Sequence, residues 1–174
     1  PSRRTQSPFS PERYPRRRNP HCSARRDDDV SWWENDGSES FTEGVIDNNF
    51  NGVEGIYPAD IDGDGDMDVV GVSNEDNDIV WWENTATFSF DPDWNAADIV
   101  TDADYATSVF AADMDNDGDM DIVSASWDDD TIAWYENTAI FSFDPTWSAS
   151  DIDTNADGAF SVFAADMDND GDMD

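Results

Sequence analysis

The most constraining feature of this sequence is an acidic nine-residue motif that recurs at a fixed interval. It occupies residues 60–68, 113–121 and 166–174, so each copy begins 53 residues after the one before. The tract Trp-Trp-Glu-Asn-Thr at 81–85 returns 53 residues later as Trp-Tyr-Glu-Asn-Thr at 134–138. A fixed period of this length is typical of stacked supersecondary units, each of which buries a face against its neighbours.

An earlier, shorter unit precedes these copies, because Trp-Trp-Glu-Asn also occurs at 32–35. Upstream of Asp27 the register disappears. All eight arginines lie there, and the chain has no lysine. We therefore predict a basic Arg/Pro-rich tail over residues 1–26, either disordered or an artefact of gene prediction; an arm that binds an acidic partner is the alternative. The repeats then cover 27–174, with a partial blade at 27–59, repeats starting near 60 and 113, and a truncated repeat at 166–174.

The charge of the chain excludes several partners. Asp and Glu number 42 against eight basic residues, which gives a formal net charge of −34. Because residues 27–174 contain no Lys or Arg, they cannot hold a nucleic-acid backbone or adhere to anionic lipid through a basic patch. No apolar run approaches the ~18 residues of a membrane span, so we expect no membrane insertion in this segment. All eight Trp lie in the acidic segment, which indicates a folded chain whose charge is neutralised by a divalent cation.

Each unit reads as a set of short strands. Residues 120–127 are rich in β-forming residues, 128–130 form a turn, and 131–135 carry apolar side chains on both faces. Further strands are expected at 147–152 and 159–165. In the Trp-Trp tracts, successive aromatic side chains should pack on opposite faces, and the following Asn should begin a turn. Four short strands in ~50 residues make one propeller blade, so the predicted fold is all-β, with four-stranded antiparallel sheets.

The acidic motif, Asp-x-Asp-x-Asp-Gly-x-x-Asp, has the spacing of a loop that wraps a hard cation. Carboxylates at positions 1, 3, 5 and 9 and the backbone carbonyl of position 7 can converge on one centre, while Gly at position 6 permits the sharp turn. The predicted metal ligands are Asp60, Asp62, Asp64, Asp66 and Asp68 in the first loop, Asp113, Asp115, Asp117, Asp119 and Asp121 in the second, and Asp166, Asp168, Asp170, Asp172 and Asp174 in the third.

Calcium is the predicted ion. Five carboxylates in nine residues repel one another by several kcal/mol, about 4 kcal/mol per pair ~4 Å apart at an effective dielectric of 20, unless a cation is present. Magnesium is a poorer fit because it takes fewer protein ligands and keeps its water. The alternative to a cation site is a solvated acidic turn with no bound ion. An EF-hand is excluded because position 12 holds Gly71 or Ser124 rather than Glu. We expect the third loop to bind most weakly.

These loops and the 53-residue period resemble FG-GAP/VCBS repeats, which build integrin-α-like β-propellers. The resemblance covers about 2.8 repeats over residues 27–174. It implies a propeller of about seven blades, a calcium ion in a blade hairpin loop, and an extracellular or cell-surface location. Since fewer than three blades cannot close a ring, the chain is expected to be a fragment of a larger propeller.

The sequence leaves several functions open. The first is a segment in which calcium is structural and which presents a surface for protein or glycan recognition in adhesion, with Trp94 and Trp147 as exposed candidates for stacking on sugars. The second is an accessory part of a secreted polysaccharide-degrading lyase or hydrolase. The third is a purely structural acidic array. Because His21 and Cys22 are the only His and Cys and lie outside the repeats, we expect no catalytic activity in this segment.

Overall fold

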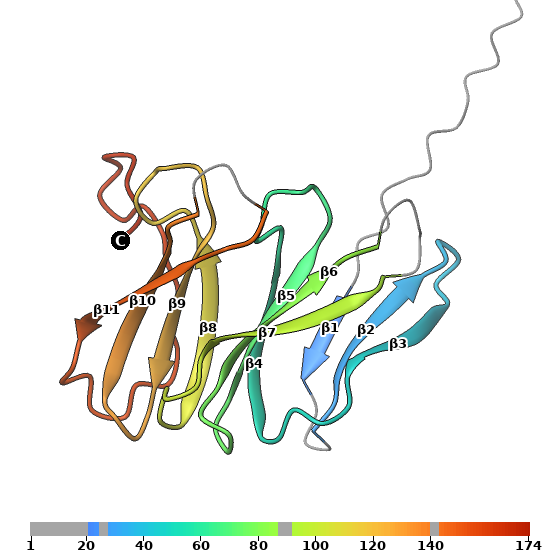
Figure 1. Ribbon diagram of the computed structural model, residues 1–174, viewed down its shortest axis with the longest axis horizontal. Coiled ribbons are helices and arrows are strands. Elements are labelled where there is room, and N and C mark those ends of the chain that lie inside the picture. The colour runs from blue at the N-terminus through green and yellow to red at the C-terminus, as the bar shows by residue number, and fades with distance from the viewer. Residues whose placement is uncertain (1–20, 25–27, 87–91, 140–142) are drawn as a thin grey trace, which may run out of the picture.

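The structure, a computed structural model, describes residues 21–24, 28–86, 92–139 and 143–174. All regular elements in these ranges are β-strands, and none of the described residues forms a helix that could span a membrane. The strands form three consecutive antiparallel sheets (Figure 1). The first holds β1 (His21–Ala24), β2 (Val30–Asn35) and β3 (Phe41–Asp47); the second holds β4 (Val53–Ala59), β5 (Asp68–Ser73), β6 (Ile79–Asn84) and β7 (Trp94–Val100); the third holds β8 (Ala106–Ala112), β9 (Asp121–Ser126), β10 (Thr131–Asn137) and β11 (Trp147–Asp153).

The second and third sheets are four-stranded meanders, which confirms the predicted fold class and blade-like unit. Their registers coincide: Val70 pairs with Trp81 in one sheet, and Val123 pairs with Trp134 in the other. Val123 follows Val70, and Trp134 follows Trp81, by 53 residues in the sequence. The sequence period is therefore a structural period, and each unit places equivalent residues at equivalent positions.

The first sheet begins earlier than the sequence predicts. Strand β1 pairs antiparallel with β2, and Cys22 lies opposite Trp32 just as Val70 lies opposite Trp81. The paired part of the chain therefore begins at His21 rather than after the expected boundary at residue 26. Backbone pairing needs no sequence motif, so this strand carried no sign of the repeat. Residues 1–20 and 25–26 of the predicted tail lie outside the described residues.

The middle strands are buried on both faces. Every residue of β5 and of β9 is buried, whereas the outer strands β7 and β11 are exposed along most of their length. A strand buried on both faces must be covered on each side, which accounts for the apolar residues on both faces of the central strands. The second sheet lies between the first and the third, whereas the far side of the third is covered by the chain beyond β11, where Phe163 contacts Phe110. The blades thus stabilise each other rather than standing alone.

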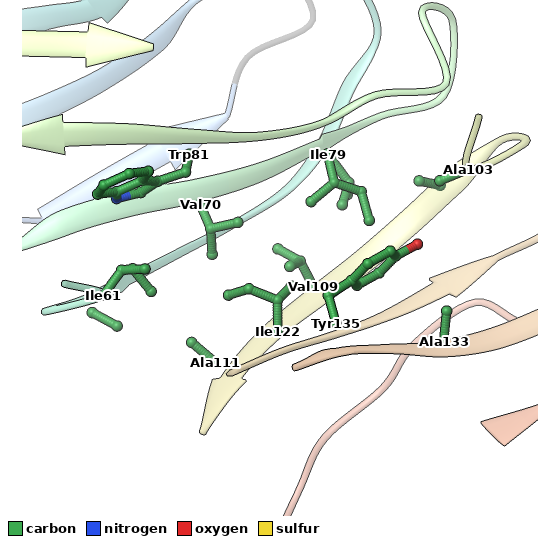
Figure 2. Packing of buried hydrophobic residues seen from close by; sticks show 13 residues of the cluster. Ile61, Val70, Ile79, Trp81, Ala103, Val109, Ala111, Ile122, Ala133 and Tyr135 are labelled. Carbon is green, nitrogen blue, oxygen red and sulfur yellow. The ribbon is translucent and has the colours of Figure 1, made fainter. Parts of the chain in front are cut away.

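Trp81 and Trp82 point to opposite faces of β6, as the alternation of a strand predicts. Trp82 is 1% exposed and packs in a cluster with Val30 and Phe50, between the first and second sheets. Trp81 belongs to a second cluster that fills the space between the second and third sheets and contains Tyr135 of β10 (Figure 2). Because each indole buries a large apolar area, these two side chains join the middle sheet to both of its neighbours.

An aromatic ladder runs across β4, β8 and the chain beyond β11. The rings of Tyr57 and Phe110 have centroids 4.6 Å apart, and those of Phe110 and Phe163 are 4.5 Å apart. These three residues are spaced 53 apart in the sequence. The nearly equal distances show that the second sheet meets the third in the same way as the third meets the chain beyond β11.

A hydrogen-bonded clasp also joins successive units at the end of the sheets opposite the acidic loops. In each clasp, a turn residue with positive φ accepts a hydrogen bond through its side-chain Oδ1 from a backbone N–H of the following unit. The pairs are Asp28 with Gly52 at 3.0 Å, Asn77 with Tyr105 at 3.0 Å, and Asp130 with Gly158 at 2.9 Å. Asp and Asn tolerate the left-handed conformation because their short side chains bond locally, so both the turn and the bond depend on these residue types.

Three local predictions have different outcomes. The Asn that follows Glu in each aromatic tract does begin a turn, since Asn84 Oδ1 accepts from the N–H of Ala86 at 3.3 Å. Residues 159–165 do not form the expected strand: a β-strand needs a partner, and only Ala165 finds one, through reciprocal backbone bonds with Asp174 at 3.3 and 3.1 Å. Trp94 and Trp147 are not exposed loop residues; they begin β7 and β11 and pack, half-buried, against the two clusters.

Candidate metal centre

The acidic loops lie at one end of the sheets, the upper end in Figure 1. The first connects β4 to β5, the second connects β8 to β9, and the third follows residue 165. In the first loop, Ala59 pairs with Asp68 across the ladder, and Ala112 pairs with Asp121 in the second. Each of these two loops is therefore a hairpin connection whose ends are fixed by a strand pair, as the sequence predicts.

Three carboxylates converge in each loop. One ligand oxygen from each of positions 1, 3 and 9 lies within 4.8 Å of the other two. The groups are Asp60, Asp62 and Asp68; Asp113, Asp115 and Asp121; and Asp166, Asp168 and Asp174. The same arrangement thus forms three times among the described residues, and it uses three of the four carboxylate positions that the motif predicts as ligands.

Position 5 lies outside this group. Asp64 Oδ1 instead accepts a hydrogen bond from the N–H of Asp66 at 2.8 Å, and Asp117 and Asp170 do the same toward Asp119 and Asp172, both at 3.0 Å. At position 7 the side chains of Asp66 and Asp172 are exposed and that of Asp119 is half-buried, and all three lie outside the converging groups. The position 5 carboxylate holds the turn that carries position 7.

Glycine at position 6 shapes the loop. Gly65, Gly118 and Gly171 have φ of 98°, 102° and 103°, a conformation that favours glycine. Each donates its N–H to Oδ2 of the Asp at position 1, at 3.1 Å in all three loops. This bond folds the middle of the loop back over position 1, which brings the carboxylates at positions 1 and 3 to one side.

The carboxylate at position 9 is buried and fixed at both oxygens in the first two loops. Asp68 is 1% exposed and accepts from the N–H of Ile61 at 3.0 Å and of Asn84 at 2.9 Å. Asp121 is equally buried and accepts from the N–H of Met114 at 3.0 Å and of Asn137 at 2.8 Å. Position 9 therefore ties the loop to the end of the third strand of its sheet. The recurrence of Asn sixteen residues after it, at 84 and 137, was the signal in the sequence that could have shown this.

Burial makes the charges in these loops unfavourable. It raises the pKa of Asp68 and of Asp62 to about 6, against the opposing effect of the backbone hydrogen bonds that each accepts. Burial likewise raises the pKa of Asp121. The negative charges of Asp64, Glu83 and Asp60 raise the pKa of Asp62 further. The folded loops therefore concentrate negative charge that residues 27–174, which contain no Lys or Arg, cannot neutralise internally.

The residues fit a bound cation. Asp60 Oδ1 and Asp113 Oδ1 are buried oxygens with no hydrogen-bond partner among the described residues. A buried carboxylate oxygen without a partner is costly, and oxygen-only ligand sets suit hard divalent cations. Asp60 and Asp113 would hold such an ion together with the position 3 and position 9 carboxylates, and the ion would supply the missing positive charge. The third loop is more exposed, so its carboxylates face a weaker demand for compensation.

Comparison with known families agrees with this geometry. A family model described as FG-GAP-like repeat matches residues 22–71, 60–124 and 113–174. The chain belongs to the FG-GAP-like repeat family. The three matches together span β1 to the last acidic loop, so the first FG-GAP-like repeat includes strand β1, which the sequence predicts as part of the tail. Searches of curated proteins and of solved structures found no match.

The titration of the FG-GAP-like loops predicts how stability depends on pH without metal. Because the folded-state pKa of Asp62 and Asp68 lies above the ordinary value of 3.8, their protonation favours folding. This contribution is present below pH 3.8 and is lost as pH rises through about 6. We expect metal-free protein to melt at a higher temperature at about pH 4.5 than at about pH 7. Calorimetry on resin-stripped protein measures this, and Asp62→Asn should make the pH dependence shallower.

Proposed function

We propose that this chain is a calcium-binding β-propeller repeat segment in which calcium is structural. The observation that carries the proposal is the pair of buried, unpartnered oxygens on Asp60 and Asp113, each inside a three-carboxylate group. Both point to a missing positive charge at the same place in two successive repeats. Calcium suits the site because it accepts many oxygen ligands in flexible geometry, whereas magnesium requires a near-ideal octahedron and retains water.

Bound calcium would hold each blade's first two strands at their junction. The carboxylates at positions 1 and 9 directly follow β4 and begin β5, so an ion between them would close the hairpin from inside. Its charge would also offset the burial and the neighbouring negative charges that together raise the pKa of Asp62. Calcium in this role would stabilise the fold, and no chemical step is assigned to it.

The test compares two substitutions that remove one charge from the same loop. Asp62→Asn removes a converging carboxylate but keeps an oxygen that can accept the N–H of Asp64, the bond that Asp62 Oδ1 makes at 3.1 Å. Asp66→Asn changes only an exposed side chain outside the group. We expect Asp62→Asn to weaken calcium binding at the first loop about tenfold or more, and Asp66→Asn to change it by about threefold or less, in titration calorimetry. Equal effects would show that general charge, not ligation, governs binding.

We further propose that the segment serves recognition or adhesion outside the cell or at its surface, presents a binding surface to a protein or a glycan, and is not itself an enzyme. Two departures from the repeat favour this role. Trp127 is 46% exposed where the preceding repeat has Asn74, and Tyr105 is 40% exposed where the neighbouring repeats have glycine. The backbone N–H of Trp127 donates to the carbonyl of Tyr105 at 3.0 Å, so both exposed rings belong to adjoining segments. Exposed aromatic side chains of this kind are typical of recognition surfaces.

The second candidate is an accessory propeller of a secreted polysaccharide-degrading enzyme. The repeats contain many carboxylates but no His, Cys, Lys or Arg after residue 26, so this segment would position a substrate rather than cleave it. Screening for protein and glycan ligands, together with polysaccharide cleavage assays on the complete gene product, separates the two candidates. Cleavage lost on mutation of a residue outside the repeats would favour the accessory role.

A further inference from the structure

Hydrogen bonds from one side chain, Asn116, join the second and third acidic loops. Asn116, at position 4 of the second loop, donates from Nδ2 to Asp172 Oδ1 at 2.7 Å and to the carbonyl of Gly171 at 3.3 Å. Both acceptors belong to the third loop, whose place beside the second is visible at the upper end of Figure 1. A donor shared between a carboxylate and a carbonyl of the next unit fixes one loop relative to the other.

The contact reaches the part of the third loop that carries ligands. Gly171 donates its N–H to Asp166 Oδ2 at 3.1 Å, and Asp172 donates its N–H to Asp170 Oδ1 at 3.0 Å. The peptide that Asn116 holds therefore lies between positions 6 and 7, where the loop turns over the position 1 carboxylate. On its own side, Asn116 lies between Asp115 and Asp117 with φ of 62°, so its orientation depends on the fold of the second loop.

Among the described residues, position 4 of the first and third loops provides no equivalent hydrogen bond to a neighbouring loop. Position 4 of the first loop is Gly63, which has no side chain to reach the second loop. Asn169, at position 4 of the third loop, makes no side-chain hydrogen bond within residues 143–174 or to the other described residues. The second and third loops are therefore joined by a side chain at position 4, whereas the first and second loops are not, because Gly63 occupies that position.

We propose that Asn116 is a positioning residue that couples the second and third cation sites, so that an ion in the second loop raises the affinity of the third. This rests on the calcium-binding role proposed above. An ion drawn to Asp113, Asp115 and Asp121 fixes the backbone that carries Asn116, and Asn116 then fixes the turn at 171–172 before the third loop is filled. The third loop is the most exposed and gains most from this ordering. The first loop binds independently.

The experiment is a double-mutant cycle on the full chain, with calcium as the probe. Asp62→Asn simplifies the titration by weakening the first loop, and the equivalent change Asp115→Asn weakens the second. We expect Asp115→Asn to lower calcium affinity at the third loop about tenfold when Asn116 is present, and by about twofold or less when Asn116→Gly is combined with it. Asn169→Gly is the matched control, because it makes the same change at an Asn that forms no hydrogen bond to another loop, and it should leave the coupling intact.

A gain of coupling gives a second, independent readout. Gly63 has φ of 75° and open space where a Cβ would lie, so Asn fits there in the conformation that Asn116 adopts. Gly63→Asn should link the first loop to the second, and Asp62→Asn should then lower affinity at the second loop. If the third-loop affinity falls equally with and without Asn116, the coupling is disproved while calcium binding stands. If the wild-type chain binds no calcium at any loop, both proposals fail together.

Discussion

Removing calcium is expected to lower the midpoint of thermal unfolding by about 10–20 °C at neutral pH. An ion present at 100 times its dissociation constant stabilises the folded state by about 2.7 kcal/mol per site, because the unfolded chain has no preformed loop. Two loops have buried, converging carboxylates, so the two ions together would stabilise the folded state by about 5 kcal/mol. For a chain of this size, 1 kcal/mol corresponds to about 2–4 °C.

Differential scanning calorimetry in low salt, with calcium and with chelator, measures this shift. Magnesium at the same concentration is the control for general charge screening and should restore only a small part of it. High sodium chloride tests the structural-array alternative, in which screening alone holds the repeats together. An unchanged melting temperature in chelator, with no metal bound to the purified protein, would contradict the proposal that the acidic loops are structural cation sites.

The second large effect is expected from Asp121→Ala, which should reduce the free energy of unfolding by about 2–4 kcal/mol even without metal. Asp121 is buried, and its two oxygens accept the N–H groups of Met114 and Asn137 at 3.0 and 2.8 Å. Alanine leaves both donors without a partner inside the protein, and each unsatisfied buried donor costs about 1–3 kcal/mol. Removing a buried charge offsets only part of this loss.

Asp174→Ala is the matched control for that experiment. Asp174 occupies position 9 of the third loop and accepts from the N–H of Met167 at 2.9 Å, but it is exposed. Its removal should change stability by only about 0.5 kcal/mol. Urea denaturation of both variants in metal-free buffer at about pH 5, where the pH dependence favours the folded state, gives the comparison. Similar losses in the two variants would mean that the hydrogen bonds of Asp121 contribute little.

Much of the fold could be predicted because the repeat makes each unit a check on the others. The repeat period predicts where the acidic loops and the aromatic strands lie. The alternation of side chains along β6 correctly predicts that Trp81 and Trp82 lie on opposite faces. Strands that depend on pairing alone were harder. Strand β1 has no motif and was missed, whereas residues 159–165 have the sequence of a strand but lack the partner that would make them one.

The sequence predicts which residues form the candidate site better than it predicts how they are arranged. Ligand spacing identified the loops, but spacing does not distinguish a carboxylate that faces the centre, such as Asp62, from one that holds the turn, such as Asp64. The burial of Asp68 depends on the third strand, which returns to the loop only in the folded sheet. The contact from Asn116 to the next loop depends on the distance between blades, which no single repeat encodes.

The ladder of Tyr57, Phe110 and Phe163 and the clasps at Asp28, Asn77 and Asp130 have a consequence for how such chains change in length. The clasp recurs at three junctions and the ladder at two, each time at equivalent positions of the repeat. A duplicated unit would therefore present compatible contact surfaces on both of its sides. Gene duplication or deletion of whole units would then alter the size of the protein without requiring any compensating substitution. An insertion or deletion should therefore be tolerated when it spans one whole repeat. Any other length would move the clasp and ladder residues away from their partners.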